Sequence, residues 1–137
     1  MRWRRGGSGG SVASGGSQGV EGHDIGMRGE MLAAEHLQSQ GWRVLDQNIR
    51  VGRGEVDILA QSPDRQWIAI VEVKTRLGAG VDPAYRITRH KKQMLKKAAG
   101  ILKERSGRRS IKWRLDVVTV DLSKGEPPTI VWYQNAI

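Results

Sequence analysis

Three charged residues lie inside two stretches that otherwise have the character of buried β-strands. Asp57 lies in 55–61, and Glu72 and Lys74 lie in 67–76. Side chains two residues apart on a strand point to the same face, so Glu72 and Lys74 should be neighbours. A short turn would make the two strands antiparallel and bring Asp57 close to Glu72. Two carboxylates that close repel each other unless a cation or a proton intervenes.

Such a carboxylate pair is typical of a magnesium site. Mg²⁺ prefers hard oxygen ligands, keeps several waters, and is commonly held by one or two carboxylates plus a substrate phosphate. The ammonium group of Lys74 could then orient a water molecule or stabilise charge on the phosphate. The alternative is an ion cluster in which Lys74 pairs with Glu72 and Asp57, and the spacing alone favours neither.

A third acid, Glu30, favours the metal site. It lies in the expected helix 25–40, on the same face as the residues of its buried stripe, Ala33, Ala34 and Leu37. An inward carboxylate needs a partner. The alternatives for Glu30 are a salt bridge to Arg28 or a supporting role behind the metal ligands.

The elements that must position these residues follow from periodicity and turn signals. Gly41 is expected to end the first helix, and Thr88 to cap a second helix whose buried seam is Leu95, Ala98 and Leu102. In 55–61, Val56, Ile58 and Ala60 should share one face. The expected order is α-β-β-β-α-β-β, a mixed α/β sandwich, over 25–40, 42–50, 55–61, 67–76, 88–105, 111–121 and 129–134.

Two of these strands carry further information. The stretch 67–76 is apolar on both faces, which indicates a central strand covered on each side. In 111–121, Asp116 lies in phase with Val118 and Val120, and we expect it to form a structural ion pair.

Length and composition indicate one domain of ordinary size. The chain has 137 residues and no cysteine, so disulfide frameworks and thiolate metal sites are excluded. Residues 1–23 are rich in glycine and serine and are expected to be a disordered tail, with a single folded domain over 24–137. No apolar run approaches the roughly 20 residues of a membrane helix, and a cytoplasmic location without membrane contact is expected.

The positive charge is concentrated in one segment. Of the formal net charge of +9, the segment 86–114 contributes twelve Lys or Arg against one acid, Glu104. A one-sided basic surface usually faces a polyanion, for which nucleic acid is the first candidate. The alternative is a solvated, lysine-rich helix that only keeps the protein soluble.

Several motifs together resemble the bacterial YraN family almost from end to end, over residues 25–137. They are GMRGEMLAAEHLQSQGWRVLDQNIR (26–50), GRGEVDILA (52–60), VEVKTR (71–76), TRHKKQ (88–93) and LDVVTVD (115–121). That family resembles the PD-(D/E)xK nuclease superfamily and is similar in layout to archaeal Holliday-junction resolvases. The resemblance implies a restriction-endonuclease-like α/β core with a central mixed sheet flanked by helices.

The resemblance also implies residue roles. Glu30, Asp57, Glu72 and Lys74 stand at the positions of the superfamily's helix glutamate, strand aspartate and Glu-x-Lys pair. These four would be catalytic, with Mg²⁺ or Mn²⁺ held by Asp57, Glu72, Glu30 and the backbone carbonyl of Val73. Val56 replaces the superfamily's proline, and Lys97 replaces a tyrosine that can follow the glutamine matched by Gln93.

A set of polar and basic residues would contact the nucleic acid. Arg53 and Arg76 flank the expected metal site in sequence, and the others lie at the start of the basic helix. The set is Arg53, Arg76, Arg89, Lys91, Lys92, Gln93 and Lys96.

The leading hypothesis is a metal-dependent nucleic-acid phosphodiesterase, an endonuclease that acts on DNA, with branched DNA as one substrate class. DNA is favoured over RNA, and a homodimer is a further expectation from the junction-cleaving relatives. The second hypothesis is a non-catalytic nucleic-acid-binding protein that retains the nuclease scaffold. The third is a protein adaptor whose basic helix meets an acidic partner.

Overall fold

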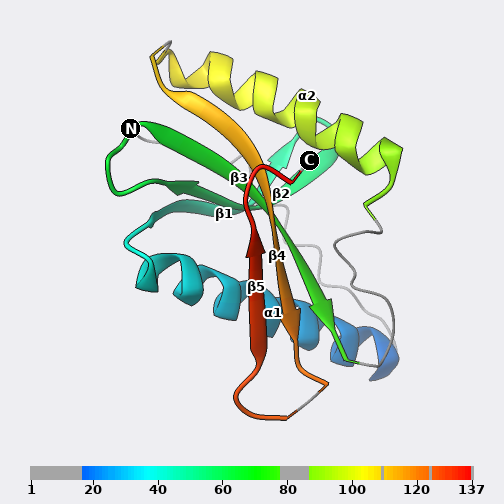
Figure 1. Cartoon of the computed structure of the whole chain (residues 1–137). Coiled ribbons are helices and arrows are strands. Elements are labelled where there is room, and N and C mark those ends of the chain that lie inside the picture. The colour runs from blue at the N-terminus through cyan, green and yellow to red at the C-terminus, as the bar shows by residue number, and fades with distance from the viewer. Residues whose placement is uncertain (1–16, 78–86, 109, 124, 137) are drawn as a thin grey trace.

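A five-stranded mixed sheet with one helix on each face forms the core of the protein (Figure 1). The computed structural model describes residues 17–77, 87–108, 110–123 and 125–136. The elements are α1 (Ser17–Ser39), β1 (Arg43–Val51), β2 (Gly54–Gln61), β3 (Trp67–Arg76), α2 (Arg89–Ser106), β4 (Lys112–Asp121) and β5 (Thr129–Tyr133). The predicted α/β class and element order are confirmed. No helix among these residues has the length and apolar character needed to cross a membrane.

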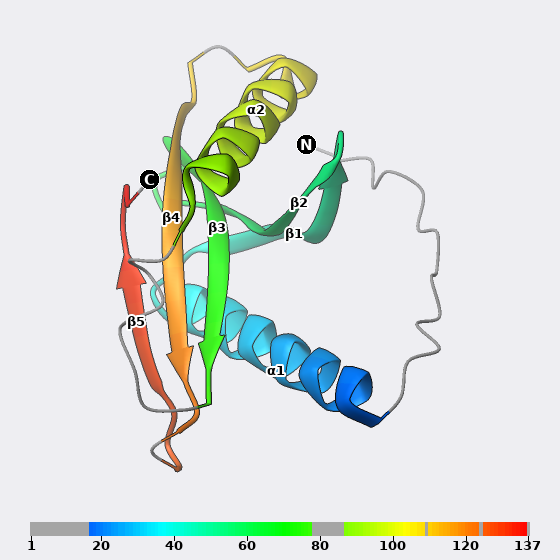
Figure 2. The ribbon, with the colours of Figure 1, turned by 90° about the vertical axis from the view of Figure 1, so that its right-hand side faces the viewer.

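The sheet has the order β1-β2-β3-β4-β5, with one parallel pair in its middle. β3 and β4 pair in parallel along their whole length, whereas the other neighbours are antiparallel. A parallel pair needs a long crossover, and α2 is the helix of that crossover. Figure 2 shows the hairpin of β1 and β2 curving away from β3, β4 and β5. The ladder between β2 and β3 is correspondingly short, from Ile58–Val71 to Gln61–Ile68.

Two apolar clusters cover the two faces of the sheet. Below α1, the stripe of Ala33, Ala34 and Leu37 packs on the sheet as predicted. Below α2, the predicted seam of Leu95, Ala98 and Leu102 is almost fully buried. The strand β3 contributes alternate residues to both clusters, which confirms that it is central.

One predicted face is wrong. Ile58 and Ala60 pack against α1, but Val56 belongs with Leu59 to the cluster below α2. Val56 lies beyond the last pair of the β2–β3 ladder, Ile58–Val71, so its side chain is not constrained by pairing with β3 to the face that Ile58 and Ala60 occupy.

The boundaries of the helices are set by local chemistry. The Thr88 hydroxyl accepts a hydrogen bond from the Lys91 backbone N–H at 3.1 Å, so the predicted cap is confirmed. Gly41, at φ 85°, follows the end of α1 as predicted. The helix α1 begins at Ser17, eight residues before the predicted start at Ile25, so 17–23 is helical rather than part of a tail. Residues 1–16, the rest of the predicted tail, lie outside the described residues.

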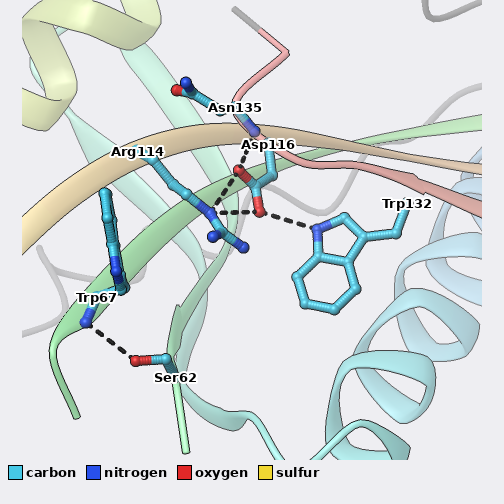
Figure 3. Close-up of polar contacts among 6 residues, drawn as sticks. All are labelled: Ser62, Trp67, Arg114, Asp116, Trp132 and Asn135. Atoms are coloured by element: carbon cyan, nitrogen blue, oxygen red, sulfur yellow. Dashed lines mark hydrogen bonds and ion pairs between the residues drawn. The ribbon is translucent and has the colours of Figure 1, made fainter. Parts of the chain in front are cut away.

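Asp116 forms the buried ion pair expected for it, shown in Figure 3. It is fully buried, and both its carboxylate oxygens accept hydrogen bonds from Arg114 Nε, at 3.0 and 3.1 Å. Trp132 Nε1–H and the Asn135 backbone N–H donate to the same carboxylate. The Arg114 guanidinium lies 4.7 Å from the ring centroid of Trp42. This network ties the middle of β4 to the C-terminal strand.

Replacing Asp116 with alanine should lower the free energy of unfolding by about 3–5 kcal/mol, because it leaves the Arg114 charge buried without a partner. Urea denaturation measures this loss. Glu104→Gln, an exposed acid on α2, is the control and should stay within about 0.5 kcal/mol of wild type. Equal stabilities for the two variants would contradict the role given to Asp116.

Candidate functional site

The candidate site begins at a fork in the sheet, where β2 leaves β3. The last residue pair of their ladder is Ile58–Val71. Beyond it the Asp57 side chain takes the place of the missing strand, because its Oδ2 accepts a hydrogen bond from the Val73 backbone N–H at 2.8 Å. The carboxylate is therefore held at the fork by the backbone of the Glu-x-Lys strand.

Glu72 is the most deeply placed charge of the site. Its side chain is 4% exposed and lies on the α2 side of β3, in phase with Ile68 and Ile70. Lys74 Nζ lies 3.5 Å from Glu72 Oε1, and Lys91 Nζ of α2 lies 3.4 Å from the same oxygen. The other oxygen, Oε2, is buried and has no hydrogen-bond partner. A buried carboxylate oxygen without a partner is costly, so it is a position where a cation would be stabilised.

The pKa of Asp57 is raised, as expected for a carboxyl group that lies close to other carboxylates. Burial and then the negative charge of Glu72 raise the pKa of Asp57 from 3.8 to about 7, and Glu30 acts in the same direction. The hydrogen bond from the Val73 N–H and the charge of Lys91 act the other way. The two acids of the strands and the acid of α1 therefore repel each other at this fork, as the sequence predicted for close carboxylates.

The position of Glu30 depends on the close packing of α1 against β3. A Cβ atom on Gly29 would overlap Oγ1 of Thr75 and lie 2.9 Å from its Cβ, so the helix backbone rests directly on the strand at that point. Glu30 follows immediately and is half-buried. Arg28, the alternative partner considered for Glu30, forms an ion pair with Glu126 of the loop before β5.

The structure brings together only part of the predicted metal shell. Glu30, Asp57 and Glu72 share one electrostatic environment, but no three of the Asp, Glu and His side chains in the described ranges are close enough to form a ready-made metal site. Val73, whose carbonyl was expected to complete the shell, meets Asp57 through its N–H. The donor set of Asp57 and the unpartnered oxygen of Glu72 still fits Mg²⁺ or Mn²⁺, which take one or two carboxylates and otherwise water or phosphate.

Lys91 is a residue of the site whose contact with Glu72 was not predicted from the sequence. It was expected to contact the nucleic-acid backbone, yet its ammonium group pairs with Glu72. A signal was present, since Thr88 predicted the helix start and places Lys91 in the first turn. The missing information was the direction of α2 relative to β3, which depends on tertiary packing.

The other predicted contact residues fall into two groups. Arg53, in the turn between β1 and β2, and Gln93, on α2, line one groove of about 420 Å³, which Met94 also lines. Arg89, Lys92 and Lys96 are exposed on α2. Arg76 is half-buried at the end of β3, and its backbone carbonyl accepts a hydrogen bond from the Leu122 N–H.

These features define a class of protein: an α/β fold whose helix glutamate, hairpin aspartate and Glu-x-Lys strand occur in the order of the PD-(D/E)xK nuclease layout. The profile of the uncharacterised protein family UPF0102 matches residues 29–120. The chain belongs to this family, which is the YraN family that the motifs resembled.

Two relatives illustrate the match. The UPF0102 protein of Geobacter sulfurreducens is 37% identical over 113 residues, covering 82% of this chain and 87% of the relative. That of Trichlorobacter lovleyi is 41% identical over 115 residues, covering 82% and 88%.

A weak structural similarity also exists. The structure of Pyrococcus furiosus SfsA in complex with Ca²⁺ is similar at a TM-score of 0.26 and 17% identity. The similarity covers 85% of this chain and 63% of the SfsA chain.

The raised pKa predicts an unusual dependence of stability on pH for Asp57→Asn. Above pH 7 the folded protein must ionise Asp57 at a cost that the unfolded chain, with its pKa of 3.8, does not bear. Asparagine retains the acceptor for the Val73 N–H without the charge. The variant should therefore be more stable than wild type at about pH 8.5, by roughly a few kcal/mol, and this advantage should shrink as pH falls through 7 towards 3.8.

Urea denaturation with a chelator present, at about pH 8.5 and about pH 5, measures this difference. The control is Asp64→Asn. Hydrogen bonds from the Ser62 hydroxyl and the Gln66 N–H lower the pKa of Asp64, so this substitution should destabilise at neutral pH and lose its effect in acid. Asp57→Asn would contradict the prediction by showing the same sign as Asp64→Asn.

Proposed function

We propose that the protein is a metal-dependent nucleic-acid phosphodiesterase, an endonuclease that acts on DNA. The observation that carries the proposal is the fork itself. There the Asp57 carboxylate, with its raised pKa, stands beside a buried glutamate that has one unpartnered oxygen and two ammonium groups on the other. A structural ion cluster would be expected to satisfy both oxygens, as the Asp116 network does.

Each residue has a chemical role in this proposal. Asp57 and Glu72 would hold the ion, with Glu30 assisting directly or through water. When bound, Mg²⁺ or Mn²⁺ supplies positive charge at the scissile phosphate and at the attacking water. Lys74, whose ammonium group lies 3.5 Å from Glu72 Oε1, orients that water and offsets the negative charge that develops on the phosphate. The water oxygen forms the new bond to phosphorus and loses a proton, the bond from phosphorus to one deoxyribose oxygen breaks, and the leaving oxygen takes up a proton to become a hydroxyl.

The basic side of α2 would hold the substrate. Arg89, Lys92 and Lys96 are exposed on the helix whose first turn reaches Glu72 through Lys91. Contacts from such residues go to phosphates and give position rather than sequence preference. Binding should therefore weaken steeply with salt.

A non-catalytic binding protein is the second candidate, and one observation favours it. Lys74 and Lys91 both pair with Glu72, so part of the acidic charge is already neutralised by the protein itself. In this alternative the basic face of α2 would bind nucleic acid while the acids remain a structural cluster. An adaptor for an acidic protein is the third.

Cleavage assays separate these candidates. With Mn²⁺, we expect the wild type to cut at least one of branched, single-stranded or duplex DNA. Asp57→Asn and Lys74→Met should each reduce the rate by at least about 100-fold while binding persists. Glu104→Gln and Lys112→Gln, exposed charges away from the fork, are matched controls and should cleave like wild type.

Each contrary outcome selects another candidate. If wild type and variants alike bind nucleic acid in a salt-sensitive way but cut no DNA or RNA, the protein is a non-catalytic nucleic-acid-binding protein. If the protein binds no nucleic acid in a salt-sensitive way, the remaining candidate is an adaptor for an acidic protein.

Metal binding can be tested without activity. Mn²⁺ should raise the free energy of unfolding of the wild type, by about 2.7 kcal/mol when the free ion is about 100 times its dissociation constant. Asp57→Asn should lose most of this gain, and binding to the wild type should release protons near pH 7 because the ion favours ionised Asp57. Thermal unfolding and calorimetry in two buffers measure these effects. An equal Mn²⁺ response in Asp57→Asn would place the ion elsewhere.

A further inference from the structure

A second basic site lies at the other end of the β1–β2 hairpin, away from the fork. A pocket of about 250 Å³ is lined by residues from three segments: β1 and β2, the turn at 62–66, and the chain after α2. The lining consists of Arg43, Val44, Leu45, Gln61, Arg65 and Arg108. Three of these six residues are arginines and none is an acid.

Gln61 gives the pocket a built-in polar group. Gln61 is 8% exposed, and its backbone pairs with that of Arg43 in the ladder between β1 and β2. No side-chain hydrogen bond of Gln61 exists among the residues that the structure describes. The side-chain nitrogen and oxygen of Gln61 are not among the fully buried polar atoms that lack a partner, so the amide is accessible and its Nε2–H can donate a hydrogen bond to a ligand.

The three arginines form no ion pair within the described part of the chain. Arg43, Arg65 and Arg108 are all exposed. The acid nearest to them in sequence, Asp64, already accepts hydrogen bonds from the Ser62 hydroxyl and the Gln66 N–H. Guanidinium groups match the oxygen geometry of phosphate, which accepts two hydrogen bonds from one arginine. The pocket therefore has the chemistry of a phosphate site.

We infer that this pocket binds a phosphate group, and that in the proposed nuclease this phosphate belongs to the nucleic acid. This second statement rests on the proposed function. The pocket lies roughly 13 Å from Asp57 along β2, measured to Gln61. Along α2, from Lys91 to Arg108, the separation is roughly 25 Å.

One strand of nucleic acid can span that separation. At about 3.4 Å per nucleotide, the two sites lie about four to seven nucleotides apart. The exposed Lys92, Lys96 and Lys103 lie on α2 between them. A substrate held at both ends of α2 would be fixed in direction as well as in position, which a single cluster of lysines does not achieve.

The test measures binding of two probes, inorganic phosphate by calorimetry and a labelled single-stranded DNA by fluorescence anisotropy at several salt concentrations. The Arg43→Gln/Arg65→Gln double variant should bind DNA at least about ten-fold more weakly, and its salt slope should fall by about 0.7 for each phosphate that the variant no longer neutralises. Arg50→Gln, an exposed arginine of β1 outside the pocket, is the matched control and should change affinity less than about two-fold.

Gln61→Leu separates binding from folding. The Gln61 amide makes no side-chain hydrogen bond in the described part of the chain, so its removal should leave the urea midpoint unchanged or higher, whereas affinity for the probes should fall. A loss of stability together with unchanged affinity would show a purely structural Gln61 and would overturn its role in the site.

The two probes distinguish the source of the phosphate. If the double variant loses both inorganic phosphate and DNA, the pocket accepts a free phosphate group; if it loses DNA alone, it recognises the nucleic-acid backbone. Both outcomes support the site. The inference is overturned if the double variant and Arg50→Gln bind both probes equally well.

The outcome for this pocket is independent of the outcome for the nuclease. Binding measured without Mn²⁺ reports on the pocket even if no substrate is cut. Conversely, the double variant could bind DNA with unchanged affinity and still cleave it with Mn²⁺ at saturating DNA. This outcome would overturn the phosphate site but support the proposed nuclease.

Discussion

The site depends on a hydrogen bond that replaces a strand. Where β2 leaves β3, the Val73 N–H would lose its cross-strand partner, and the Asp57 carboxylate supplies the acceptor. A backbone donor that is half-buried must be satisfied, so the sheet itself requires an acceptor here. The same group is thereby held beside Glu72, where its negative charge is unfavourable. The sheet requires an acceptor for the Val73 N–H at the fork, and Asp57 supplies it despite the repulsion from Glu72. A purely structural acceptor would not need to carry a negative charge at this position.

Two of the buried acids of the sheet, Asp116 and Glu72, show the difference between a satisfied and an incompletely satisfied carboxylate. Asp116 accepts hydrogen bonds from Arg114, Trp132 and Asn135, and the network in Figure 3 ties β4 to the chain end. Glu72 is nearly as deeply buried, yet both its lysine partners approach one oxygen. A structural carboxylate usually has both oxygens hydrogen-bonded, as Asp116 does, whereas an open carboxylate oxygen in a charged site is typical of a place for a ligand.

Much of the fold and the grouping of the acids could be predicted from the sequence. The strand β3 was predicted to the residue, because its turn residues and apolar faces are local signals. The cap at Thr88 and the ion pair of Asp116 were also predictable, since each depends on residue type and phase. Each of these features depends mainly on the residues of a single helix or strand and its flanking turns.

The rest depended on how elements meet. The side chain of Val56 faces the other cluster beyond the point where β2 stops pairing with β3, and no residue in 54–61 signals where that pairing ends. Lys91 reaches Glu72 because of the direction of α2, which is set by packing across the sheet. The arginine pocket joins residues from positions 43, 65 and 108, whose proximity exists only in the folded chain.

The contact of Gly29 with Thr75 has a consequence for how such proteins can vary. The spacing between α1 and β3 is set by a missing methyl group, since any side chain at position 29 would wedge the helix outward. Glu30, the next residue, would move outward with the helix, away from Asp57 and Glu72 on the strands. Positions 29 and 75 should therefore change size in a compensating manner across homologues, with a bulkier helix residue tolerated only above a smaller strand residue.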